Sequence, residues 1–299
     1  MSCKLLLVTL LIAAFALVQA SPPKPPPGYK WVRNWAFSDE FNGNALDGKW
    51  QKFHPFWKGR EPCLFDASTV SVSGGLLRIR NKWYNSPKWV KLHNGKVKKF
   101  TMGCGVITTK RRDARYGYYE ARMKASKIML GSAVFMSNQK QLLNATVQCR
   151  TDKYSQELDI IESVGAAGYQ KWFYFRNNQM NGNTHYRHAP CGTSEEKYHT
   201  SGPHRKNLST KTYEAFHVYG AWWRNAHRVD FYADNQWYST AWIKNTIDKT
   251  NPFDRPMFVT MVTESYYHST PYPNKWQLSN NDINTSYWDW FRAWYLVKQ

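Results

Sequence analysis

The sequence has few acidic side chains. It contains 21 Asp and Glu residues against 41 Lys and Arg, which gives a formal net charge of +20 over 299 residues. Much of the excess lies between Lys82 and Lys124, where twelve basic residues accompany only Asp113 and Glu120. A field of this sign attracts polyanionic partners. A solvated basic surface that keeps the protein soluble explains the charge equally well.

Long apolar runs are also scarce. One such run, from Leu5 to Val18, follows Lys4 and leads to a small-residue VQA site before Ser21. It is too short for a membrane span and has the features of an export signal, so we expect residues 1–20 to be a signal peptide. The mature protein should then be secreted, with a charge of +19 after the loss of one lysine. Outside the cell an acidic polysaccharide is a better partner than nucleic acid, and we expect no nucleic acid and no membrane.

The chain lacks sustained 3.6-residue periodicity with a cap at both ends, internal repeats, and any linker after the proline-rich entry at Pro22–Pro27. Short strand patterns dominate instead. Val70–Arg80 and Arg228–Trp242 each contain two β-prone runs around a turn, which predicts two hairpins. Many short strands joined by polar loops favour an all-β sandwich or jelly roll, with residues 21–299 forming a single domain.

Strict alternation predicts the faces of the last strand. In Tyr287–Leu296 it places Trp288 and Trp290 on one side and Phe291 on the other. The chain has 15 Trp, 19 Tyr and 15 Phe residues, and most of them belong in a core. Trp and Tyr also have a flat apolar face that suits the C–H-rich face of a sugar ring, so this excess is compatible with a carbohydrate groove.

Cysteines are few, and one of them lies in the predicted signal peptide. Removal of that segment leaves Cys63, Cys104, Cys149 and Cys191. An even number in an oxidising compartment predicts two disulfides, whose pairing the sequence leaves open. Three Asn-x-Ser/Thr sequons are compatible with N-glycosylation. They begin at Asn144, Asn207 and Asn284.

The most informative stretch is ELDIIE, residues 157–162, with three carboxylates among apolar residues. In a regular strand Glu157 and Asp159 share one face, and Glu162 points to the other. One extra residue in a β-bulge would return Glu162 to the face of its neighbours. The candidates for that residue are Leu158, Ile160 and Ile161.

Three carboxylates on one face resist joint ionisation, so one of them keeps its proton. Glycoside hydrolysis with retention uses such a pair, with carboxyl groups about 5–5.5 Å apart. We therefore expect Glu157 to be the nucleophile and Glu162 the general acid and later the base, while Asp159 holds or shares a proton. Acids scattered on a surface strand for solubility are the alternative.

ELDIIE resembles the E-x-D-x-x-E signature of the bulged branch of glycoside hydrolase family 16. FSDEFNGNALDGKW at 37–50 is similar to the family's opening strand, and DWFR at 289–292 to its closing strand. The segments WKGREPCLFDASTVSVSGGLLRIR at 57–80 and GVITTKRRDARYGYYEARMKAS at 105–126 resemble the agarase and porphyranase group more than the laminarinases. The resemblance implies a β-sandwich jelly roll of two curved antiparallel sheets with a substrate cleft on the concave face.

The same resemblance implies subsite residues. Trp57, Arg60 and Glu61 match positions that face the sugars on the nonreducing side of the cut. Glu264 matches an acidic position near the cleavage site. Phe135 stands where the family usually has Trp, next to a long loop at 139–154. That difference flanks the catalytic strand and bears on the substrate rather than on the mechanism.

One of two histidines, His185 or His188, should lie beside the leaving-group sugar. A His-x-x-His pair can also bind metal, but no third ligand lies at a telling distance, so we expect no metal and no cofactor. The resemblance implies a monomeric, secreted endo-hydrolase that cuts β-1,4 bonds in red-algal galactans. The basic charge favours a sulfated chain such as porphyran. The alternatives are a β-1,3-glucanase, a non-catalytic sugar-binding protein on the same scaffold, and a polyanion binder driven by charge alone.

Overall fold

The computed structural model describes residues 22–92, 94–138, 141–142, 153–166, 177–189, 197–244, 251–267 and 270–299. The predicted signal peptide lies outside these residues, as do Cys149, Cys191 and the sequon at Asn144. No helix in the described ranges has the length and apolar character needed to cross a membrane.

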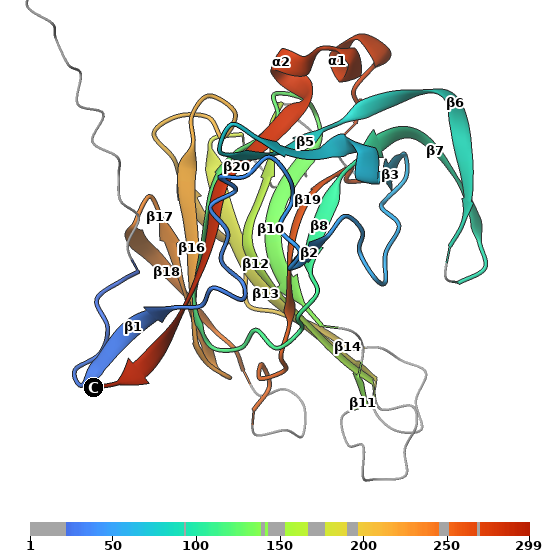
Figure 1. The fold of residues 1–299 in the computed structure, drawn as a ribbon. Coiled ribbons are helices and arrows are strands. Elements are labelled where there is room, and N and C mark those ends of the chain that lie inside the picture. The colour runs from blue at the N-terminus through green and yellow to red at the C-terminus, as the bar shows by residue number, and fades with distance from the viewer. Residues whose placement is uncertain are drawn as a thin grey trace, which may run out of the picture.

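Two large antiparallel sheets make up most of the protein (Figure 1). The first has the order β18-β17-β16-β9-β20-β5-β4, with β1 paired to β20. Its strands are β1 (Tyr29–Arg33), β4 (Val70–Ser73), β5 (Leu76–Arg80), β9 (Gly117–Lys124), β16 (His217–Asn225), β17 (Arg228–Ala233), β18 (Gln236–Trp242) and β20 (Thr285–Lys298). The all-β prediction is confirmed.

The second sheet has the order β14-β13-β12-β10-β19-β8-β2, with β11 paired to β12 and β15 to β13. Its strands are β2 (Trp50–Gln51), β8 (Val106–Thr109), β10 (Gly131–Ser137), β11 (Gln141–Leu142), β12 (Lys153–Val164), β13 (Gln179–Ala189), β14 (Lys197–Thr200), β15 (His204–Asn207) and β19 (Phe258–Glu264). The ELDIIE segment lies in β12, one of the inner strands, between β10 and β13.

A small third sheet projects from the body as a long hairpin (Figure 1). It consists of β3 (Cys63–Phe65), β6 (Lys82–Lys91) and β7 (Val97–Cys104). Helical structure is limited to η1 (Ala67–Thr69), α1 (Lys275–Ser279) and α2 (Asn281–Asn284). The third sheet carries several of the lysines that make residues 82–124 so basic.

The main core lies between the two large sheets. Both sheets contribute large buried side chains, such as Trp223 and Trp288 from the first and Leu158 and Met261 from the second. Burial of this apolar area stabilises the sandwich by about 25 cal/mol per Å² removed from water. The core therefore fixes which face of each strand is left to form a cleft.

Both predicted hairpins are confirmed. β4 and β5 are joined by Gly74 and Gly75, and β17 and β18 by Asp234 and Asn235. All four turn residues have positive φ, between 47° and 73°. This is the conformation that two-residue turns of a right-twisted hairpin require, and Gly, Asn and Asp adopt it most readily.

Three details of the sequence prediction are corrected. A register shift between Trp288 and Trp290 shows a bulge in β20, so Trp288 points into the core rather than to the outer side with Trp290. Residues 37–50 form an isolated bridge at Asp39, turns and the first residue of β2, Trp50, in place of a continuous opening strand. The sequon at Asn284 cannot carry a glycan in the folded protein, because the side chain is 1% exposed and its Nδ2 donates to the Leu278 carbonyl at 2.7 Å. Asn207 is exposed, and its glycosylation stays a prediction.

A disulfide joins two neighbouring strands of the third sheet. Cys63 in β3 is bonded to Cys104 in β7, with their Cα atoms 5.6 Å apart and both residues fully buried. This selects one of the cysteine pairs that the sequence left open. The bond closes a loop of 41 residues, which in the chain-entropy picture stabilises the fold by roughly 4 kcal/mol.

We expect the double variant Cys63→Ser/Cys104→Ser to fold less stably than the native chain, because the unfolded chain regains the entropy that the bond removes. Urea denaturation followed by tryptophan fluorescence should show a midpoint lower than that of the native protein. The midpoint of the native protein should also fall when its disulfide is reduced after unfolding. An unchanged midpoint in both experiments would contradict a stabilising role.

Candidate active site

A bulge in β12 gathers the carboxylates. β10 and β12 pair with Val134 opposite Ile161 and Phe135 opposite Asp159, so Ile160 is the extra residue. Ile160 and Ile161 both lie in the main core, as does Leu158. The predicted bulge is confirmed, and it falls on one of the three residues considered.

The bulge returns Glu162 to the face of the other two acids. Glu157, Asp159 and Glu162 stand opposite Ser137, Phe135 and Ala133 in turn, and these are alternate residues on one face of β10. That face is turned away from the main core, because Val134 and Met136, on the other face of β10, are core residues. The apolar residues of β12 bury one side of the strand while the acids line the other.

The neighbouring strand β19 adds a fourth acid. Glu264 pairs with Gly131 of β10 and is 5% exposed. Between the acids, Phe135 packs with Val106, Ala133 and Val262 to form an apolar floor. The small side chain of Ala133, opposite Glu162, leaves room above that floor.

A tyrosine that the sequence analysis did not single out positions the proposed general acid. The hydroxyl of Tyr266 donates to Glu162 Oε1 at 2.9 Å. Its ring lies over Gly131, where a Cβ atom would be 2.4 Å from Tyr266 Cε2. Glycine at 131 therefore makes room for the ring, and any larger residue would displace it from Glu162. No pattern near residue 266 in the sequence reveals this contact, because it depends on the pairing of β10 with β19.

His185 is the histidine that faces the acids. It pairs with Glu157 across β12 and β13, and its Nε2 lies 2.9 Å from Asp159 Oδ2. Its Nδ1 is hydrogen-bonded to the hydroxyl of Tyr198 in β14. His188 is three positions further along β13, so it points to the opposite face and stacks on His199. The geometry thus favours His185 over His188 for a role in the cleft.

Arg60 lies among three aromatic rings beside Glu264. Its guanidinium carbon is 5.6, 5.0 and 5.6 Å from the ring centroids of Trp57, Tyr266 and Tyr267. Nη1 of Arg60 is 3.1 Å from Glu264 Oε2. Burial works against its charge, but Glu264 raises the pKa of Arg60, so this side chain supplies a fixed positive charge at the acid cluster.

Glu61 points toward the third sheet and not toward the acids. Its Oε2 is 2.6 Å from Lys98 Nζ, and its Oε1 accepts a hydrogen bond from the backbone N–H of Lys99 at 2.9 Å. It remains on the wall of a neighbouring pocket. The structure therefore places Trp57 and Arg60 beside the acid cluster and Glu61 one step further away.

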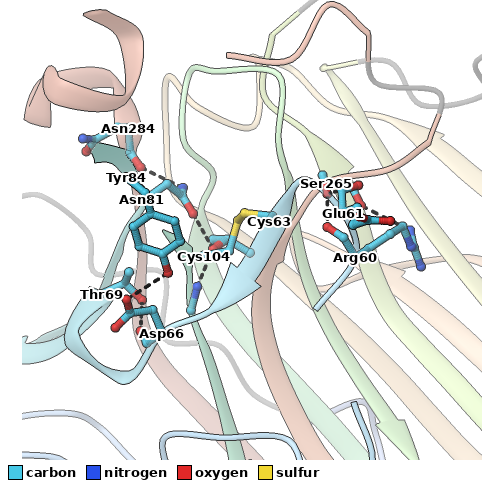
Figure 2. The surroundings of a disulfide bond; sticks show 12 residues. Arg60, Glu61, Cys63, Asp66, Thr69, Asn81, Tyr84, Cys104, Ser265 and Asn284 are labelled. Atoms are coloured by element: carbon cyan, nitrogen blue, oxygen red, sulfur yellow. Dashed lines mark hydrogen bonds between the residues drawn. A yellow bond between two sulfur atoms is a disulfide. The ribbon is translucent and has the colours of Figure 1, made fainter. Parts of the chain in front are cut away.

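The segment that carries these three residues is held from two sides (Figure 2). Cys63 fixes it to β7 through the disulfide. The hydroxyl of Ser265 donates to the Arg60 and Glu61 carbonyls, the second at 3.1 Å. Because Ser265 lies between Glu264 and Tyr266, the same short stretch positions both the segment and the contacts of the acid cluster.

Of the four acids, Glu157 lines a cavity of about 500 Å³. Its walls include Trp57 and Arg60 on one side, Phe135 below, and Glu157 and His185 on the other. Aromatic surfaces next to a few convergent polar groups are typical of sites that bind sugars and other small ligands. Of the residues expected in the cleft, Trp57, Arg60, Phe135, Glu157 and His185 line this cavity. Asp159, Glu162 and Glu264 share the face of Glu157 but are not among its lining residues, and neither are His188 and Glu61.

Burial and mutual repulsion raise the pKa of every acid in the cluster. Burial, and then the charge of Asp159, raise the pKa of Glu157 to about 7. Burial and the same neighbour raise the pKa of Glu162 well above its usual range, although the Tyr266 hydrogen bond opposes this shift. Glu157 therefore ionises before Glu162, which is the order that a nucleophile and a general acid require.

The other two acids also hold protons near neutrality. Burial, with the charge of Glu264, raises the pKa of Asp159 to about 8. Burial raises the pKa of Glu264 to about 7, against the effect of Arg60. Asp159 Oδ2 and Glu264 Oε2 are buried but lack a well-aligned hydrogen bond, despite their close basic neighbours. Asp159 Oδ2 is 2.9 Å from His185 Nε2, and Glu264 Oε2 is 3.1 Å from Arg60 Nη1, so each oxygen faces a basic group.

One set of side chains could also hold a cation. Ligand atoms of Glu157, Asp159 and His185 lie within 4.8 Å of one another, the one such cluster in the described part of the chain. Two carboxylates and an imidazole suit several divalent ions. The same raised pKa values mean that a cation would have to displace protons there. The expectation of no metal stays a prediction.

Comparison with known proteins gives a consistent result. The family described as "Beta-porphyranase A-D, GH16 domain" matches residues 31–296. β-Porphyranase B of Phocaeicola plebeius is 38% identical over 290 residues, which is 92% of this chain and 88% of that protein. β-Porphyranase E of Zobellia galactanivorans is 37% identical over 274 residues, which is 91% and 90%.

The solved structures agree with the sequences. The crystal structure of a β-porphyranase from the human gut bacterium Bacteroides plebeius superposes with a TM-score of 0.82 at 37% identity, covering 92% of this chain and 95% of that one. The family match and the superposition show that this jelly-roll protein is a glycoside hydrolase of family 16. Within that class, this chain belongs to the β-porphyranase A–D family.

We expect the stability of the protein to fall as pH rises from about 4 to 8. In the unfolded chain these carboxyls lose their protons near pH 4. In the folded protein they keep them to about pH 7 or 8, so their contribution to stability is complete below the unfolded pKa and is lost as pH rises through the folded pKa. Asp159→Asn removes the charge that acts most strongly on both Glu157 and Glu162, so it should make the fall shallower.

Urea denaturation between pH 4 and 9 tests this expectation. The matched control is Asp282→Asn, at an exposed acid far from the cleft, which should keep the slope of the native protein. Equal slopes in the native protein and Asp159→Asn would show that the acids do not interact as described.

Proposed function

We propose that the protein is a secreted, retaining endo-hydrolase of red-algal galactans that cuts β-1,4 bonds, with sulfated porphyran as the preferred chain. The observation that carries this proposal is the bulge at Ile160, which brings Glu157 and Glu162 onto one wall of the cleft. The names of the related proteins support the substrate class, since the relatives described above are β-porphyranases.

In the proposed mechanism, ionised Glu157 attacks the anomeric carbon while protonated Glu162 delivers its proton to the leaving oxygen. A glycosyl-enzyme ester forms, and the leaving sugar departs with that proton. Glu162, now ionised, then removes a proton from water, which attacks the ester and releases Glu157. Two inversions at one carbon leave its configuration unchanged.

Asp159 and Tyr266 act on the pKa values of the two glutamates. Asp159 lies between the two glutamates on the cleft face, and its charge raises the pKa of both. Tyr266 donates to Glu162 and stabilises the ionised form that the second step needs. His185, held by Tyr198, stands beside Glu157 on the side of β13, where the leaving-group sugar would lie.

Two other readings make different predictions. A β-1,3-glucanase would release reducing sugar from laminarin and leave agar and porphyran intact. A non-catalytic binder would bind without turnover, yet this chain keeps all three carboxylates, with raised pKa values, on one face of β12 beside a cavity that Glu157 lines, which favours catalysis.

We expect Glu157→Gln and Glu162→Gln each to lower kcat about 10³-fold or more on the best substrate, since each removes a group that bonds to or protonates the reacting atoms. Both variants should fold at least as stably as the native protein, because each removes a buried group that resists ionisation. Glu214→Gln, at an exposed acid outside the cleft, is the matched control and should keep native activity. Substantial turnover by either cleft variant would refute its assigned role.

Screening the protein lacking residues 1–20 on agarose, porphyran, carrageenans and laminarin tests the substrate. We expect products of several sugars from porphyran, and NMR of the fresh product should show the β anomer first. Laminarin as the one polymer cleaved would establish the glucanase instead. Binding to heparin and galactans alike, lost at high salt and without turnover, would support attraction by charge alone.

A further inference from the structure

The hairpin of β6 and β7 has two chemically different faces. Strand alternation places Lys98 and Phe100 on one face, while Lys99 lies on the other, where its Nζ is 5.8 Å from the ring centroid of Trp89. Phe100 is fully buried against Leu64, so the first face is turned toward the segment that carries Trp57 and Arg60. The second face is exposed to solvent.

A pocket of about 360 Å³ lies between that first face and the segment 56–61. Its apolar walls are Phe56, Trp57, Phe100 and Tyr267, and its polar walls include Lys58, Asn94 and Lys98. Phe56, Trp57 and Arg60 line both this pocket and the cavity that Glu157 lines. The cleft thus continues past Arg60 onto the hairpin.

The lysines of the hairpin differ in their partners. Lys82 and Lys88 lie 3.0 and 3.2 Å from Asp66, at the base of the hairpin. Lys98 is paired with Glu61. Lys58 has no carboxylate partner within the described ranges. Arg60, which also lines the pocket, is paired with Glu264, so Lys58 is the cation that leaves the pocket with an excess of positive charge.

We propose that this hairpin pocket is a distal subsite for a sulfated sugar of the same polysaccharide chain whose bond is cut at the acids. The ring would stack on the aromatic wall, where Tyr267 is 68% exposed and free to meet a ligand. The sulfate ester would lie between Lys58 and Lys98, since charge-assisted hydrogen bonds to an anionic oxygen are the strongest such contacts. The proposal rests on the proposed function, because it extends the cleft of the same enzyme.

Glu61 has a defined part in this subsite. It holds Lys98 and the backbone of Lys99, so it fixes the hairpin at a set distance from Trp57 and Arg60. Without the hairpin, the cleft would end at Arg60.

The test uses sulfated porphyran oligosaccharides of increasing length and two double variants of equal charge change. Lys58→Met/Lys98→Met alters the pocket. Lys91→Met/Lys99→Met alters the same hairpin at positions that do not line the pocket. For the native protein, kcat/KM should rise about tenfold at the length that first reaches the hairpin, which corresponds to about 1.4 kcal/mol.

The pocket variant should lose that rise, and binding of the longer oligosaccharides by calorimetry should weaken equally. The control variant should keep both. Persistence of the rise in the pocket variant, or the same loss in both variants, would overturn the subsite and indicate general attraction by charge. If the oligosaccharides bind with the predicted dependence on Lys58 and Lys98 but are never cut, the subsite stands and the proposed hydrolysis fails.

Discussion

Repulsion among four acids on one wall of a cleft is the constraint around which this structure is built. Glu157, Asp159, Glu162 and Glu264 can share that wall because β12 carries one extra residue and because β10 and β19 hold their registers beside it. Carboxylates that lie close together and away from water raise one another's pKa, so the cluster keeps protons in the folded protein. This repulsion raises the pKa of Glu162 more than that of Glu157, and the difference separates the roles of the two glutamates. Because these pKa values are raised, the folded protein is less stable above neutral pH than it would be without the cluster.

The surrounding contacts limit this repulsion without removing it. Arg60 neutralises Glu264 on one side, and Tyr266 donates to Glu162 in the middle. Both depend on distant parts of the chain, since Ser265 ties the Arg60 segment to the end of β19, and Gly131 leaves space for the Tyr266 ring. The buried disulfide fixes the same segment from the outside. A change in any of these would therefore also act on the pKa of the acids.

Much of this was accessible from the sequence because alternation is a local property. The hairpins, the all-β class and the need for a bulge in ELDIIE all follow from residues within a few positions of one another. Alternation failed where a bulge had no cluster of charges to reveal it, as at Trp288, whose side chain lies in the core. Tyr266, Gly131 and Tyr198 could not be found, because their contacts arise from strand pairing between residues far apart in the chain. Sequence alone also left His185 and His188 equivalent. In the structure both lie in β13, where a spacing of three residues places them on opposite faces of the strand.

In the folded protein, the positions of the basic side chains matter more than their number. Net charge acts over a Debye length of about 8–10 Å and attracts any polyanion, so by itself it selects no substrate. Selection requires cations held at fixed positions next to surfaces that fit a sugar. Arg60 among its three rings is one such position, and the hairpin pocket with Lys58 and Lys98 is a second. Lys91 and Lys99, on the far face of the same hairpin, add to the general field without this geometry. One face of the basic hairpin would therefore bind a sulfated sugar, while the other face only adds positive charge. This difference between the faces would make the enzyme select a substrate and not merely attract polyanions.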